Sequence, residues 1–107
     1  MNRLAEVLER LAAVIAARRG DDPAGSWSAR LLADRPLAAK KLAEEALEAA
    51  LAAVQNDRKA LISESADVIY HLLALLAGAD ISLEEVAEEL ERREGRSGIL
   101  EKASRGV

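Results

Sequence analysis

The stretch KKLAEEALEAAL, residues 40–51, holds the pattern that decides the fold. Its alanine, leucine, lysine and glutamate residues are all strong helix formers, and the stretch contains no proline, glycine or β-branched residue. At 3.6 residues per turn, the predicted helix gathers its large apolar residues on one stripe and its glutamates along the edge of that stripe. The stripe consists of Leu47, Leu51 and Val54, and the edge consists of Glu44, Glu45 and Glu48. Three anions beside an apolar stripe call for a physical reason.

The composition of the whole chain predicts the same class of structure. Its 107 residues suit one domain, spanning 1–107, with a single core. Half of the residues are hydrophobic, 32% are charged, 2% are aromatic and none is phenylalanine. A core of leucine, isoleucine, valine and alanine favours packed helices over sheets, so we expect an all-α fold. Because the chain has no cysteine, disulfide frameworks, thiolate metal sites and cysteine nucleophiles are excluded.

Charge and hydropathy narrow the classes of partner. No apolar run approaches the roughly 20 residues of a membrane span, and no signal-peptide pattern opens the chain. The net charge of −4 argues against nucleic acid as the main partner. We therefore expect a cytoplasmic protein with no membrane or nucleic-acid partner.

The apolar periodicity and the capping residues predict four helices, and a fifth if the first loop holds one. The first helix ends near residues 18–20, the second covers about 37–55, and the third runs from a cap at Asn56 or Asp57 to about Ala77. Ser82 and Glu85 have the spacing of a capping box for the last helix. Residues 20–36 are expected to form a ligand loop with at most one short helical turn. The basic tail from residue 95 is expected to lie over the bundle or over a partner chain. We therefore predict a four-to-five-helix bundle.

A second acidic pattern lies on the predicted third helix, in ESADVIYH at residues 64–71. Glu64, Asp67 and His71 are three and four residues apart, so they share one face of that helix. The short connection at residues 56–57 makes the second and third helices antiparallel neighbours. Their carboxylates are therefore expected to face one another.

Carboxylates crowded at a partly dry helix interface repel unless a cation neutralises them. A donor set made only of oxygen suits Mg²⁺ or Mn²⁺, and Mg²⁺ usually completes its shell with water and substrate phosphate. The pattern thus predicts a metal site and a phosphorylated substrate. The predicted ligands are Glu45, Glu48, Glu64 and Asp67.

Simpler interpretations stand beside this one. Glu44 alone is typical of a solvated helix face, and Lys40 and Lys41 have the spacing of ion-pair partners for Glu44 and Glu45. A lone histidine such as His71 is more often a satisfied core residue than a ligand, so at most it supports a ligand. Tyr70 is expected to point away from the acids and to pack or to reach a partner chain. Trp27 either covers the end of the bundle or stacks on a base.

The paired motifs EExxE at residues 44–48 and ExxD at residues 64–67 resemble the signature of the all-α, MazG-like nucleotide pyrophosphohydrolases. Over nearly the whole chain, the segments SWSARLLAD, AAKKLAEEALEAALAA, SESADVIYHLLALLA and EKASR resemble the phosphoribosyl-ATP pyrophosphohydrolase family of histidine biosynthesis. Two positions depart from the family pattern: Ala43 replaces a common glycine and Trp27 a frequent tyrosine.

The resemblance implies Mg²⁺-dependent cleavage of phosphoribosyl-ATP to phosphoribosyl-AMP and pyrophosphate by a homodimer. Glu45 is then a catalytic metal ligand, and Glu44 either completes a second metal site or acts as the general base. The expected substrate contacts are Lys40, Lys41, Lys102 and Arg105 as phosphate clamps, with Ser26, Trp27 and Ser28 from the loop. A housecleaning nucleotide pyrophosphatase and a non-enzymatic helical interaction protein are the alternatives.

Overall fold

The computed structural model describes residues 2–95 and residue 102. The predicted all-α class is confirmed, because the described part of the chain consists of five helices joined by turns and contains no strand. The helices are α1 (Arg3–Ala17), α2 (Trp27–Ala33), α3 (Arg35–Val54), α4 (Arg58–Gly78) and α5 (Leu83–Arg93).

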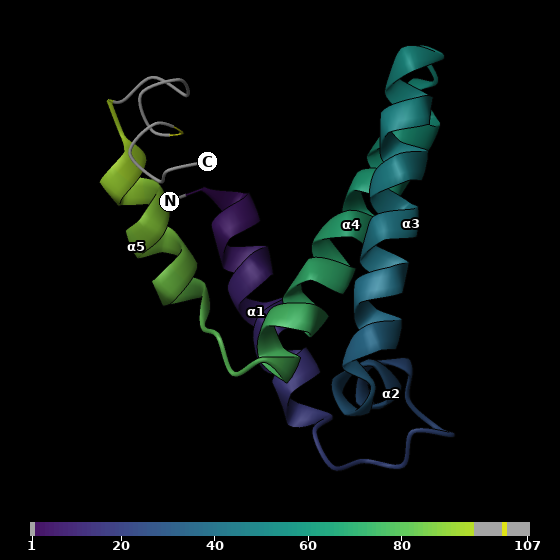
Figure 1. The fold of residues 1–107 in the computed structure, drawn as a ribbon, viewed down its shortest axis with the longest axis vertical. Helices are drawn as coiled ribbons and strands as arrows, with labels where there is room; N and C mark the ends of the chain where they lie inside the picture. Colours follow the sequence, from purple (N-terminus) through teal and green to yellow (C-terminus); the bar gives the residue numbers. More distant parts are fainter. Residues whose placement is uncertain (1, 96–101, 103–107) are drawn as a thin grey trace.

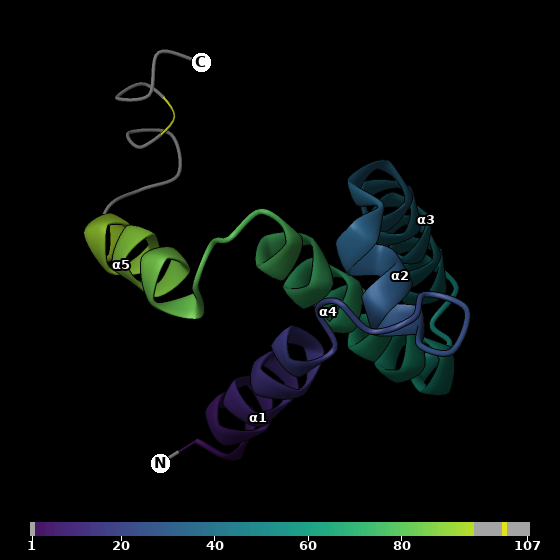
Figure 2. The ribbon, with the colours of Figure 1, turned by 90° about the horizontal axis from the view of Figure 1, so that it is seen from below.

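Helices α3 and α4 form a long antiparallel hairpin, and α1 and α2 pack near its lower end (Figure 1). Helix α4 is the central element, since α1, α2 and α3 all pack against it. The core lies where these four helices meet. Its buried members are Ile15, Leu31, Ala38, Leu73 and Ala74. Helix α5 stands apart from the hairpin in both views (Figures 1 and 2).

The caps predicted from the sequence are present. Asp57 caps α4 by accepting a hydrogen bond from the amide of Ala60, whereas Asn56 takes a left-handed conformation with φ 57°. Ser82 and Glu85 form both hydrogen bonds of a capping box at the start of α5. These local interactions fix where α4, which carries Glu64 and Asp67, and α5 begin.

The expected loop over residues 20–36 is wrong in its second half. Residues 27–33 form the seven-residue helix α2 instead of at most one short turn. Ser26 caps this helix by accepting from the amide of Ala29, and burial of Ala29 and Leu31 in the core stabilises it. Asp34 then caps α3 directly, so α3 begins at Arg35, two residues earlier than predicted.

Helix α4 bears on the expectation that the chain does not span a membrane. By length and composition alone, it is long and apolar enough to cross a membrane. It carries Glu64 and Asp67, however, and packs against three other helices, so its composition is a weak indication of a membrane span.

The apolar stripe of α3 is largely exposed in the single chain. Leu47, Leu51 and Val54 keep 61%, 48% and 79% of their surfaces accessible, and Ile62 of α4 keeps 61%. The chain therefore buries the lower end of the α3–α4 hairpin and leaves much of its upper part without a cover.

Candidate functional site

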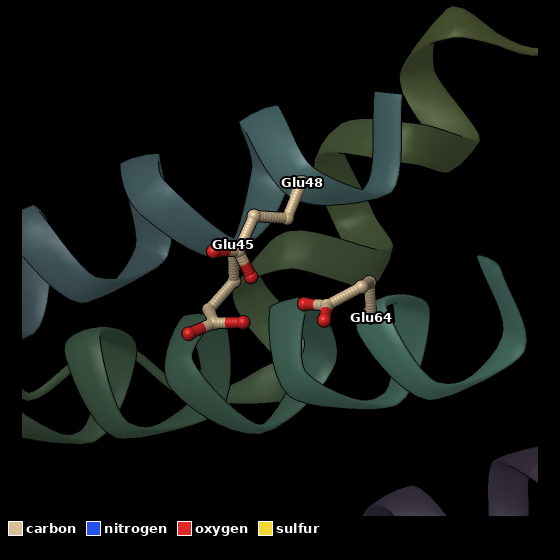
Figure 3. A group of neighbouring side chains, drawn as sticks. All are labelled: Glu45, Glu48 and Glu64. Carbon is tan, nitrogen blue, oxygen red and sulfur yellow. The ribbon is translucent and has the colours of Figure 1, made fainter. Parts of the chain in front are cut away.

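Three carboxylates converge between α3 and α4. Glu45 and Glu48 are three residues apart on one face of α3, and Glu64 lies opposite them near the start of α4 (Figure 3). Each offers one oxygen atom, and these three oxygen atoms lie within 4.8 Å of one another. The antiparallel hairpin, joined by only three residues between Val54 and Arg58, sets this register.

Glu64 differs from the other two carboxylates in having a buried oxygen atom, Oε2, without a hydrogen-bond partner among the described residues. The neighbouring carboxylate of Glu45, the loss of water around the group and the charge of Glu48 together raise the pKa of Glu64 to about 7. The same contact with Glu64 lowers the pKa of Glu45. The pair thus holds a proton on Glu64 near neutral pH when no cation is bound.

A hard divalent cation fits this arrangement. An unpartnered, buried carboxylate oxygen costs free energy, and a cation beside it supplies the missing partner. The donors are all oxygen atoms, which suits Mg²⁺ or Mn²⁺. Glu45, Glu48 and Glu64 are therefore the residues that the structure offers for a metal ion.

Asp67, the fourth predicted ligand, lies outside this group of three. Its side chain is half-buried one turn further along α4, and its backbone carbonyl oxygen accepts a hydrogen bond from Nδ1 of His71 at 2.8 Å. Glu44 also lies outside the group, with a side chain that is 47% exposed.

Lys41 is the cation nearest the group in sequence. Its Nζ atom lies 3.5 Å from a carboxylate oxygen of Glu44 and 3.5 Å from one of Glu45. The ion pairs that the spacing of Lys41 from Glu44 and Glu45 predicted are thus present in the structure. Partial loss of water favours the neutral amine, but the two carboxylates prevail and raise the pKa of Lys41 above 10.5. Lys40 is exposed on the neighbouring face.

Helix α2 is joined to α4 by two side-chain hydrogen bonds. The indole Nε1 of Trp27 donates to Nε2 of His71 at 3.3 Å, and the hydroxyls of Ser28 and Tyr70 lie 2.6 Å apart. The sequence suggested neither contact, because the partners are 44 and 42 residues apart. Tyr70 therefore reaches a residue of its own chain.

The tail contributes two further predicted contacts. Lys102 is exposed, and Arg105 lies outside the described residues. The predicted role of EKASR over the bundle thus stays a prediction.

The raised pKa of Glu64 predicts a pH dependence. Between about pH 4.5 and 7, the folded metal-free protein holds a proton on Glu64 that the unfolded chain has lost. This contribution to the free energy of unfolding is therefore complete below pH 4.5 and is lost as pH rises through about 7. The lowered pKa of Glu45 acts in the opposite sense, at lower pH.

We expect the melting temperature in EDTA to fall between pH 5 and 7.5 more in wild type than in Glu64→Gln. Mg²⁺ should bind more tightly as pH rises towards 7, because binding displaces the proton. Thermal unfolding and Mg²⁺ titration across this range measure both effects. Parallel pH profiles for wild type and Glu64→Gln would contradict the assignment.

Comparisons with known proteins agree with one another. The model of the family described as phosphoribosyl-ATP pyrophosphohydrolase matches residues 8–94. A phosphoribosyl-ATP pyrophosphatase of Caulobacter vibrioides is 60% identical over 103 residues, which cover 96% of each chain. Proteins of the same name from Cereibacter sphaeroides and Dinoroseobacter shibae are 60% and 61% identical, covering 94% and 92% of this chain and 98% of each relative. With similarity of this extent, the chain belongs to the phosphoribosyl-ATP pyrophosphohydrolase family.

Proposed function

We propose that this protein hydrolyses the α,β-phosphoanhydride of phosphoribosyl-ATP to phosphoribosyl-AMP and pyrophosphate, the second step of histidine biosynthesis. The family match over residues 8–94 supports the substrate and the reaction. The observation that carries the chemistry is the group of three carboxylates between α3 and α4.

We assign the metal to Mg²⁺, with Mn²⁺ as a substitute, held by Glu45, Glu48 and Glu64. Asp67 is the proposed fourth ligand, which requires its side chain to turn towards the group. When bound, Mg²⁺ neutralises triphosphate charge and stabilises the leaving pyrophosphate. The buried, unpartnered oxygen of Glu64 supports this assignment.

In the proposed reaction, water supplies the oxygen that forms the new bond to phosphorus, and the anhydride bond breaks with release of pyrophosphate. Glu44 is the proposed general base, because it adjoins Glu45 yet lies outside the group of three. Lys41 holds Glu44 and Glu45 in place before substrate arrives. We propose that it then turns to a phosphate oxygen.

The remaining proposed contacts surround the phosphates. Lys40, Lys102 and Arg105 supply positive charge, without which an acidic site would repel its substrate. The Ser26 hydroxyl caps α2 and the Ser28 hydroxyl contacts Tyr70, but a hydroxyl has more than one bonding position and each stays able to reach substrate.

The test is release of pyrophosphate from phosphoribosyl-ATP by the purified protein with Mg²⁺, beside ATP, dATP and dCTP at equal concentrations. We expect phosphoribosyl-ATP to be cleaved at least about 100-fold more efficiently, as expected for a site that loses specific contacts with the smaller nucleotides. Equal cleavage of all four would favour a housecleaning enzyme. No metal-dependent cleavage of any would favour an interaction protein.

We also propose a homodimer that covers the exposed stripe of α3, in a cytoplasmic enzyme that takes a small nucleotide and no nucleic acid or membrane as partner. Contiguous exposed apolar side chains mark interaction surfaces. The stripe runs beside Glu48, so the second copy would border the metal centre.

The dimer prediction is tested by sedimentation at assay concentrations. Wild type should sediment as a dimer, and Val54→Glu should dissociate it, because a carboxylate would be buried without a partner. Gln55→Glu, an exposed polar neighbour, is the control. A wild-type protein that is monomeric and active would contradict the proposal.

A further inference from the structure

His71 is hydrogen-bonded at both ring nitrogens. Only 6% of its surface is exposed. Nδ1 lies 2.8 Å from the backbone carbonyl oxygen of Asp67, and Nε2 accepts from the indole of Trp27 at 3.3 Å. Because an indole N–H can only donate, Nε2 is the acceptor and Nδ1 carries the proton. The ring is thus fixed in one tautomer, and its position is tied to the backbone of α4.

Trp27 is held by its edge. The planes of the indole and imidazole rings meet at 79°, and the contact uses the indole N–H. The residue nevertheless keeps 41% of its surface exposed, with Cζ of Arg30 5.6 Å from the ring centroid. Helix α2 covers the core with Ala29 and Leu31 instead. The indole is therefore anchored at its edge and keeps part of its surface exposed, which favours the base-stacking interpretation over a role as core cover.

The residue that anchors the indole, His71, lies on the same helix as Glu64 of the carboxylate group. His71 is seven residues, about two turns or 10 Å, beyond Glu64 on α4, and seven residues return a helix to nearly the same face. This separation is on the scale of the distance from a base, across its ribose, to the middle of a triphosphate. An aromatic ring held by His71 would then lie within reach of the base of a nucleotide whose phosphates were bound at the carboxylate group.

We propose that Trp27 is the stacking surface for the adenine ring of the substrate and that His71 is the positioning residue that holds the indole in place. The inference rests on the proposed function for the identity of the nucleotide. His71 touches no reacting atom in this scheme and acts through Trp27, so its loss should affect substrate binding more than turnover.

Trp27 is the single tryptophan of the chain, so indole fluorescence reports on this residue alone. Titration of the Mg²⁺-loaded wild-type protein with AMP should quench and shift the emission, whereas ribose 5-phosphate, which lacks the base, should leave it unchanged. Equal responses to the two probes, or no response to saturating AMP, would overturn the stacking role.

Two substitutions test the positioning role. His71→Gln keeps an acceptor for the indole and a donor for the Asp67 carbonyl, whereas His71→Leu removes both. We expect His71→Leu to raise KM for phosphoribosyl-ATP about fivefold with kcat and Mg²⁺ affinity within about twofold, and His71→Gln to restore KM within about twofold. Equal losses in both variants, or a loss confined to kcat, would overturn it.

Trp27→Phe provides the matched control, because it keeps an aromatic face and loses the N–H. If His71 acts only through Trp27, Trp27→Phe and the double variant Trp27→Phe/His71→Leu should have the same KM, because Trp27→Phe alone already removes the hydrogen bond to His71. Additive losses would contradict the scheme. If His71→Leu does not fold, the comparison of Trp27→Phe with Trp27→Ala decides, since only the alanine variant should lose AMP binding altogether.

Failure of the proposed reaction and failure of the stacking role give different experimental results. Wild-type protein that quenches with AMP but releases no pyrophosphate from phosphoribosyl-ATP would refute the proposed reaction and support the stacking surface. Wild-type protein that cleaves phosphoribosyl-ATP without a fluorescence response to AMP would support the proposed reaction and refute the stacking surface.

Discussion

Glu48→Gln should abolish most of the rise in melting temperature that Mg²⁺ or Mn²⁺ gives to the wild-type protein. The neutral amide keeps the shape of the side chain but removes one of the three carboxylates that converge between α3 and α4. Because Glu48 is exposed, the substitution should leave the metal-free fold intact. We expect kcat/KM to fall by at least about 100-fold, equivalent to ~2.7 kcal/mol of transition-state stabilisation.

Thermal unfolding with and without metal measures the first effect, and pyrophosphate release measures the second. Glu64→Gln should behave in the same way, since Glu64 supplies the buried oxygen of the group. Glu88→Gln, an exposed glutamate of α5, is the matched control and should keep both the metal response and the activity. A Glu48→Gln protein with an unchanged metal response would remove this residue from the ligand set.

Deleting residues 101–107 should lower kcat/KM at least about tenfold, or about 1.4 kcal/mol. The segment contains Lys102 and Arg105 three residues apart and has no apolar stripe to bury. If these cations reach phosphate oxygens, their loss removes charge-assisted hydrogen bonds to the substrate. The three carboxylates lie elsewhere, so helical content and Mg²⁺-induced stabilisation should survive.

Circular dichroism, thermal unfolding with Mg²⁺ and steady-state kinetics separate these effects. The variant Lys102→Ala/Arg105→Ala in the full-length chain is the matched test of charge against length. It should reproduce most of the loss that the deletion causes. Wild-type kinetics from the truncated chain would show that the two cations are solvated and dispensable.

The sequence by itself determined the features that depend on local chemistry. Alanine-rich and leucine-rich runs specified the helices, and side chains such as Asp57 and Ser82 specified where α4 and α5 begin, because a cap acts within three residues. The spacing of Glu45 and Glu48 placed them on one face of α3, and the short connection to α4 brought Glu64 opposite them. The close approach of these three carboxylates was therefore predictable without a structure, although their role as metal ligands stays a prediction.

Only the tertiary structure decided what depends on contacts between distant segments. Residues 27–33 became a helix because Ala29 and Leu31 are buried in the core, which the turn-forming composition around them concealed. The separation of Asp67 from the carboxylate group depends on how α3 and α4 pack, since helical spacing alone fixes only the face. The bond between Trp27 and His71 arises because packing brings α2 against α4, and no local pattern records an approach across 44 residues.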